Sequence, residues 1–130
     1  MKTANYQTYS GDLEPVSIAR RKSPYAGPMR EYKLLAPTYA MMQLSDAAYG
    51  VAFRKYLATL DAAQVYEELG EDTILLCWER YGLPCHRRLV AEWLEEKLGV
   101  EVTENGHPRD AVRSYDESVA YKKAQGSLAI

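Results

Sequence analysis

The chain has 130 residues, of which 47% are hydrophobic and 26% are charged, and its formal net charge is -2. This length and composition are typical of one globular domain with its own core, so we treat residues 1–130 as a single domain. The net charge excludes an overall basic field of the kind that many nucleic-acid-binding proteins carry.

The sequence predicts neither a membrane-spanning helix nor a signal peptide. No apolar run reaches the ~20 residues that a membrane-spanning helix needs, so we expect no membrane partner. The polar start of the chain lacks the apolar middle of a signal peptide, and two cysteines do not make a disulfide framework. These observations predict a cytoplasmic protein.

The N-terminal part of the chain predicts little regular structure. Residues 1–14 are polar and turn-rich, whereas residues 15–19 alternate apolar and small side chains, as a short strand does. Residues 20–36 contain two prolines and a glycine, which predict a long loop of the kind that often carries function. Pro37 then suits the first turn of a short helix that ends near Leu44.

Helical signals dominate the middle of the chain. Ser45 supplies an N-cap for a helix whose apolar residues recur at helical spacing as far as Leu60. Asp61 and Gln64 have the spacing of a capping box, which begins another helix, and Gly70 ends it.

A strand and a helix follow in close succession. Residues 74–78 are a continuous apolar run, which indicates a buried strand. Residues 85–98 form an amphipathic helix that Gly99 ends, and residues 100–102 predict a last short strand.

The C-terminal part, from about residue 107 to 130, is predicted to be a helix or tail. Ser114 and Glu117 have capping-box spacing, so we expect a helix near residues 115–125. The predicted strands lie apart in the sequence with helices between them, which favours parallel pairing. The predicted fold class is therefore α/β: a small layered domain with a short, mostly parallel sheet flanked by helices.

The segment from Thr73 to Leu98 carries the strongest functional signal. Its strand is followed by Glu79, and after a short loop Cys85 and His86 begin a helix. Both cysteines of the chain fall inside this segment. In open α/β sheets, ligands bind beyond the carboxyl ends of the strands and near helix N-termini. The sequence therefore predicts a site at this place.

Cys85 is a candidate nucleophile. It follows Pro84 at a helix start, where unpaired N–H groups favour a thiolate, and a protonated His86 or Arg87 beside it would lower the pKa of the thiol further. His86 and Glu79 are the candidate acid–base groups, and Glu79 has the alternative role of orienting Arg87 or His86 through an ion pair. The alternative for Cys85 is a buried cysteine without chemistry.

Cys77 lies inside the apolar run, where a buried structural cysteine is the simplest interpretation. A transient disulfide with Cys85 is an alternative, and it requires Cα atoms closer than about 7 Å. Cys77, Cys85, His86 and His107 offer metal-binding atoms, but no pair has the short spacing of a structural zinc site. We therefore expect no metal and no cofactor.

Arg20 and Arg87 are candidate groups for holding a phosphate or carboxylate, because each follows a strand or begins a helix at the expected ligand edge. We expect Cys77 to share that ligand-binding wall. Of the eleven tyrosines, most fit core positions, whereas Tyr9 lies in a loop and is a candidate ligand contact.

The residues Leu75–Glu79 and Pro84–Val90 resemble the signature of the family called domain of unknown function four-eighty-eight. That signature pairs a strand ending in Cys-x-Glu with a helix starting Cys-His-Arg, and the resemblance spans roughly residues 6–104. This chain departs from the family in its long helical insert before the Cys77 strand and in its short sequence before Val16.

The resemblance implies a small α/β domain of bacterial or phage origin with no established reaction. It also implies one pocket, surrounded by Arg20, Cys77, Glu79, Cys85, His86 and Arg87.

Two functions fit these observations. In the first, the protein is a thiol-dependent enzyme that acts on a small anionic ligand, a nucleotide or nucleic-acid component, with Cys85 as the nucleophile. In the second, it is a non-catalytic protein that uses the same groups to bind a small anionic ligand or a protein partner. The sequence leaves open whether the protein is an enzyme.

Overall fold

The computed structural model describes residues 1–107 and 113–128, so part of the predicted C-terminal helix or tail lies outside the described residues. One sheet in the described part has the strand order β3–β2–β4–β1–β5, and all its pairings are parallel. The strands are β1 (Lys2–Asn5), β2 (Glu14–Ser17), β3 (Arg30–Glu31), β4 (Thr73–Cys77) and β5 (Thr103–Glu104). The prediction of a small α/β domain with a mostly parallel sheet is confirmed.

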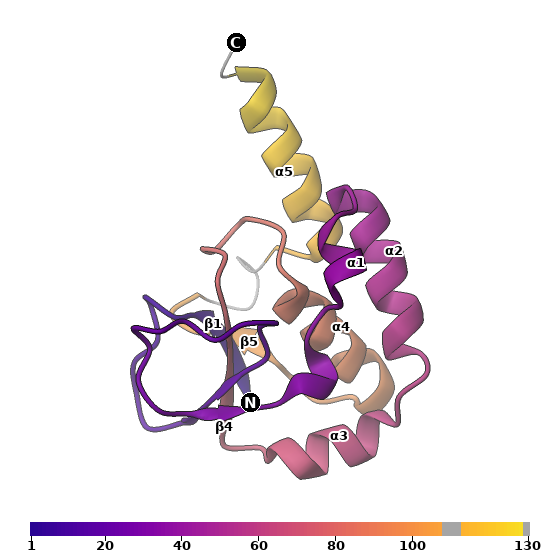
Figure 1. Cartoon of the computed structure of the whole chain (residues 1–130). Coiled ribbons are helices and arrows are strands. Elements are labelled where there is room, and N and C mark those ends of the chain that lie inside the picture. The colour runs from indigo at the N-terminus through magenta and orange to yellow at the C-terminus, as the bar shows by residue number, and fades with distance from the viewer. Residues whose placement is uncertain (108–112, 129–130) are drawn as a thin grey trace.

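The helices gather on one side of this sheet, and α5 extends away from the rest of the molecule (Figure 1). They are the short 3₁₀ helix η1 (Lys33–Leu35) and the α-helices α1 (Tyr39–Met42), α2 (Asp46–Leu57), α3 (Ala62–Leu69), α4 (His86–Leu98) and α5 (Tyr115–Leu128). Among the described residues, no helix combines the length and the apolar character that crossing a membrane requires.

The predicted ends of α3 and α4 and the predicted start of α5 are confirmed, whereas α2 ends at Leu57 rather than Leu60, and α1 is shorter than the helix predicted from Pro37 to Leu44. Asp61 accepts a hydrogen bond from the backbone N–H of Gln64 over 3.2 Å, and Gly70 ends α3 at a positive φ of 92°. Ser114 and Glu117 satisfy each other's backbone N–H groups over 3.1 and 3.5 Å, as a capping box does. Gly99 ends α4 in the left-handed conformation.

The N-terminal residues correct the sequence prediction. Residues 2–5 form β1, which pairs with the central strand β4, although the sequence predicted a turn-rich segment there. β1 has a single buried apolar side chain, Ala4, so it carries no alternating pattern. Pairing with β4 stabilises β1 instead, and that contact is invisible in the local sequence.

Two further strands also lie elsewhere than predicted. β3 falls inside the segment 20–36, which was predicted as a loop, and β5 lies after the predicted strand at 100–102. Each has two residues, which is too short for any sequence pattern to reveal.

Alternation along β4 divides its side chains between the two faces of the sheet. Leu75 belongs to the main core, which the helices cover, and the period of two places Cys77 on that same face. Ile74 and Leu76 point to the opposite face. There the connection between β1 and β2 has no helix, and its side chains cover the sheet: Tyr6, Tyr9 and Leu13, together with Met29.

Parallel pairing brings the carboxyl ends of the strands to one edge of the sheet. Asn5, Ser17, Cys77 and Glu104 end β1, β2, β4 and β5 there. Cys85, the N-cap of α4, lies bonded to the end of β4 at this edge. The fold therefore gathers strand ends and a helix start at the edge where the sequence predicted a site.

Candidate functional site

A cavity of about 450 Å³ opens at this edge, and we call it the carboxyl-edge cavity. Its wall comes from the residues after β2, from the α1–α2 region, and from the β4–α4 segment. The lining residues that bear on its chemistry are Ala19, Arg20, Arg21, Tyr39, Tyr49, Cys77, Trp78, Glu79, Cys85 and His86. The structure thus brings together five of the residues singled out from the sequence.

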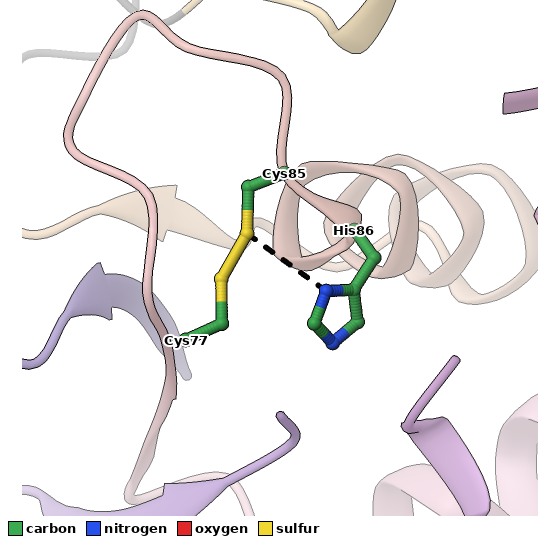
Figure 2. A group of neighbouring side chains, drawn as sticks. All are labelled: Cys77, Cys85 and His86. Carbon is green, nitrogen blue, oxygen red and sulfur yellow. Dashed lines mark hydrogen bonds between the residues drawn. A yellow bond between two sulfur atoms is a disulfide. The ribbon is translucent and has the colours of Figure 1, made fainter. Parts of the chain in front are cut away.

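Cys77 and Cys85 are joined by a disulfide (Figure 2). Both residues line the cavity. Cys77 is the last residue of β4 and Cys85 is the N-cap of α4, and both are buried. Their Cα atoms lie 7.5 Å apart, so the limit of about 7 Å that we applied to the sequence was too strict. In this form Cys85 carries no thiol.

His86 lies beside the disulfide with its two ring nitrogens in different environments (Figure 2). Nε2 is 2.7 Å from the backbone oxygen of Ile18. A carbonyl oxygen only accepts hydrogen bonds, so Nε2 carries the proton and Nδ1 keeps its lone pair. Nδ1 lies 3.9 Å from the sulfur of Cys85. The imidazole therefore presents an acceptor to that sulfur.

Burial keeps this imidazole uncharged. It lowers the pKa of His86 from 6.5 to about 4, the Ile18 carbonyl opposes the change, and the charge of Arg87 adds to it. The sequence predicted that a protonated His86 would activate Cys85. The structure corrects this: at neutral pH the ring is a neutral base.

Arg87 is directed away from the cavity into a buried ion pair with Glu104. Nε and Nη2 donate to the Glu104 carboxylate, while Nη1 donates to the sulfur of Cys77 over 3.2 Å and to the carbonyl of Glu79 over 2.6 Å. Arg87 is not among the cavity-lining residues. This corrects the expectation that it holds a ligand anion, because every guanidinium nitrogen already has a protein partner.

The carboxylate of Glu79 stays at the cavity. It lines the wall, and its Oε2 lies 3.9 Å from the sulfur of Cys77. The expectation that Glu79 orients Arg87 by an ion pair is corrected, because Glu104 takes that place and Glu79 supplies only its backbone oxygen. Its side chain is therefore placed toward the cavity, where an acid–base group would act.

Positive charge reaches the cavity from the residues after β2. Arg20 and Arg21 both line it, and the guanidinium carbon of Arg20 lies 5.3 Å from the centre of the Tyr39 ring. The indole N–H of Trp78 donates to the carbonyl of Arg21 over 2.8 Å, which ties this segment to the end of β4. Of the two arginines predicted to hold an anion, Arg20 lines the cavity and Arg87 does not.

Tyr9 lies on the other side of the sheet from the cavity. Its hydroxyl donates to the carbonyl of Leu13 over 2.9 Å, and its ring packs on the cluster around Ile74 and Leu76. This corrects the prediction that Tyr9 contacts a ligand. The loop that carries it covers the face opposite the helices.

Sequence reasoning missed several residues of the site. Tyr39 and Trp78 line the cavity with exposed aromatic surface, and Glu104 holds Arg87 from the last strand. Trp78 is the last residue of the predicted apolar strand, and that position was the available signal for it. Tyr39 and Glu104 reach the site from distant segments, so no local spacing marks them.

Comparison of the chain with models of known families, with curated proteins and with solved structures finds no match. The resemblance to the domain of unknown function four-eighty-eight family therefore stays a prediction.

Proposed function

We propose that this protein is a thiol-dependent enzyme that acts on a small anionic ligand bound in the carboxyl-edge cavity. One observation carries the proposal. The sulfur of Cys85 faces the unprotonated Nδ1 of His86, which the Ile18 carbonyl holds in that tautomer, on the wall of a cavity that also contains Arg20. A thiol, a base and a cation around one cavity are the parts that nucleophilic catalysis on an anion requires.

The lining supports a nucleotide or nucleic-acid component as the ligand class. Arg20 offers charged donors that suit a phosphate, and the exposed rings of Tyr39 and Trp78 offer flat surfaces on which a base can stack. The carboxylate of Glu79 is an acceptor for amino or hydroxyl groups of the ligand. A volume of about 450 Å³ falls in the range of small-molecule sites.

The chemistry requires the disulfide to be reduced by a cellular dithiol, which leaves two thiols and an oxidised dithiol. The Cys85 thiol then passes its proton to Nδ1 of His86, because the negative charge that forms on the adjacent sulfur stabilises the imidazolium and offsets the burial that disfavours it. The sulfur forms a bond to an electrophilic carbon of the ligand. The leaving group takes the proton from His86 as it departs. Water then cleaves the sulfur–carbon bond and restores the thiol.

Cys77 has a separate role in this scheme. Nη1 of Arg87 donates to its sulfur, so the reduced side chain has a charge-assisted hydrogen bond ready for a thiolate. This donor makes Cys77 the resolving cysteine: after a peroxide oxidises the Cys85 thiolate to a sulfenic acid, the Cys77 thiolate attacks the Cys85 sulfur, water leaves, and the disulfide closes.

A second candidate function is favoured by the disulfide itself. In the oxidised form neither sulfur is a nucleophile, yet Arg20, Glu79 and the aromatic rings still line the cavity. That form fits a non-catalytic protein that binds a small anionic ligand. The two candidates differ in one respect: the enzyme uses its thiols to change the ligand chemically, whereas the binding protein holds the ligand without reacting with it.

The test is alkylation of the reduced protein by iodoacetamide at neutral pH with a chelator present, in a Cys77→Ser background. We expect Cys85 to react faster than a cysteine in an unfolded peptide, and His86→Gln to slow the reaction at least tenfold. Gln keeps an amide that can donate to the Ile18 carbonyl but offers no basic nitrogen to the sulfur. His107→Gln, which changes the histidine stacked on Tyr81, is the matched control.

Ligand binding is tested in the same assay with nucleoside monophosphates and inorganic phosphate as probes. We expect a nucleoside monophosphate to protect Cys85, and Arg20→Ala to abolish that protection, whereas Lys55→Ala on the exposed surface of α2 leaves it unchanged. If Cys85 reacts no faster than a cysteine in the unfolded peptide, the proposal of a thiol-dependent enzyme is wrong. Equal nucleotide binding by the oxidised and reduced proteins, combined with slow alkylation, would establish the binding protein instead.

A further inference from the structure

We infer that the reduced site is a binding site for a soft divalent metal ion, with Zn²⁺ as the representative ion. The donor atoms of Cys77, Cys85 and His86 all lie within 4.8 Å of one another in the described part of the chain, and all three residues are buried. Two thiolates and one imidazole are a donor set that selects zinc over hard ions such as magnesium.

The imidazole is already held as a metal-ligating histidine is held. Its Nε2–H is bonded to the Ile18 carbonyl, and this second contact directs the lone pair of Nδ1 toward the sulfurs. Metal-binding histidines almost always donate their other ring nitrogen to a carbonyl or carboxylate in this way. The sequence spacing alone argued against a zinc site, because this orientation of His86 depends on Ile18, which is distant in the sequence.

The surroundings also balance the charge of such a site. Nη1 of Arg87 donates to the sulfur of Cys77, and the charge of Arg87 is itself neutralised by Glu104. Two thiolates neutralise one divalent ion, so the complete cluster adds no net charge to the buried region. Binding releases the two thiol protons to solvent as the zinc–sulfur bonds form.

The backbone leaves room for the ion. Two thiolates bound tetrahedrally at ~2.3 Å stand roughly 3.8 Å apart, so the ion needs more space than a direct bond between the sulfurs. The Cα atoms of Cys77 and Cys85 are 7.5 Å apart, beyond the span of about 4.4–6.8 Å that is usual for disulfides. All three ligands line the carboxyl-edge cavity, so a fourth position is open to water or ligand from that side.

This inference rests on the proposed function, because it uses the same reduced cysteines. It adds a regulatory state: zinc binding and nucleophilic attack exclude each other, since the metal occupies the lone pairs of Cys85 and His86. The metal also keeps the sulfurs apart, so it protects them from oxidation to the disulfide. The oxidised protein, in contrast, lacks two of the three ligands.

The test is a titration of the reduced full chain with Zn²⁺ in competition with a chromophoric chelator. We expect one ion per chain, no binding by the oxidised protein, and at least a hundredfold loss of affinity in Cys77→Ser and Cys85→Ser. His86→Gln should lose at least tenfold, and His107→Gln nothing. With Co²⁺ in place of zinc, we expect thiolate-to-cobalt charge-transfer bands and the intense visible bands of a tetrahedral site.

The zinc titration tests the metal site, and the alkylation of Cys85 in chelator tests the enzyme, so the two proposals can fail separately. Absence of binding by the reduced chain would overturn the metal site, as would equal affinity in Cys85→Ser and the unmodified protein. Fast alkylation of Cys85 in chelator would leave the enzyme proposal standing in either case. If both hold, stoichiometric Zn²⁺ should slow that alkylation by at least tenfold, and the chelator should restore it.

Discussion

Arg87 donates its Nη1–H to the sulfur of Cys77 over 3.2 Å while its Nη2 lies 2.7 Å from the carboxylate of Glu104. The side chains of Arg87 and Glu104 are 1% and 3% exposed. This buried pair joins the start of α4 to the ends of β4 and β5. The pair contacts the disulfide through the sulfur of Cys77, so the stability of the domain and the geometry of the site depend on the same two charges.

Removing one charge from this pair should destabilise the protein strongly. Glu104→Gln leaves the buried guanidinium without a counter-charge, so we expect the free energy of unfolding to fall by about 3–5 kcal/mol. Urea denaturation measures the change. Glu14→Gln is the control, because the Arg30–Glu14 pair is largely exposed and an exposed pair contributes about 1 kcal/mol or less. Equal losses in the two variants would contradict this account.

Reduction of the disulfide should lower stability moderately. The bridge joins residues with a sequence separation of 8. A loop of that size lowers the entropy of the unfolded chain, so reduction should lower the free energy of unfolding by about 2–3 kcal/mol. Unfolding in urea with and without a metal-free reductant measures this difference, in chelator so that no metal contributes. The double variant Cys77→Ser, Cys85→Ser should show no effect of the reductant. An unchanged midpoint for the unmodified chain would rule out the bridge in solution.

His86 should make the oxidised protein less stable as the pH falls. Burial lowers its pKa in the folded state to about 4, against 6.5 in the unfolded chain. Between these values the unfolded state binds more protons, so stability is complete above about pH 6.5 and decreases toward pH 4. A separation of this size corresponds to roughly 3 kcal/mol.

The pH effect is measured as the difference between the urea stability profiles of the oxidised protein and of His86→Gln, both in chelator. Gln does not titrate, so the variant should lack this component of the pH dependence. Parallel profiles between pH 6.5 and 4 would show that His86 is not a buried neutral base.

Gly50 of α2 lies close to the ring of Tyr115, the first residue of α5. A Cβ at this position would lie 2.6 Å from Cε1 of Tyr115, and that ring is held because its hydroxyl donates to the carbonyl of Asp46. We expect Gly50→Ala to lower the free energy of unfolding by about 1–3 kcal/mol through overpacking.

Gly126→Ala is the matched substitution for Gly50→Ala. No atom lies within 4 Å of a Cβ there, so higher helix propensity should leave stability unchanged or raise it by up to about 1 kcal/mol. Thermal or urea unfolding distinguishes the two. A neutral Gly50→Ala would mean that α5 moves away from α2 without cost, and the packing described for Tyr115 would be wrong.

Part of the candidate site followed from the sequence because its residues are neighbours in the chain. An apolar run predicted a strand over residues 74–78 and an amphipathic period predicted a helix over 85–98, and the structure has them as β4 (Thr73–Cys77) and α4 (His86–Leu98). Their meeting follows from parallel topology. Arg87 shows the limit of such reasoning. Its place at a helix start predicted an anion-binding role, but the direction of its side chain depended on Glu104 in a strand too short to predict.

The sequence by itself determined the α-helices, several of their caps and the short segment that holds Cys77, Glu79, Cys85 and His86, because these features depend on residues within a few positions of one another. It did not reveal η1 (Lys33–Leu35), which lies inside the predicted loop. Only the tertiary structure decided that residues 2–5 form a strand, that Tyr9 lies on the opposite face, and that Ile18 fixes the tautomer of His86. Those outcomes are contacts between distant segments. Their free energy comes from packing and burial in the assembled fold, which no local pattern records.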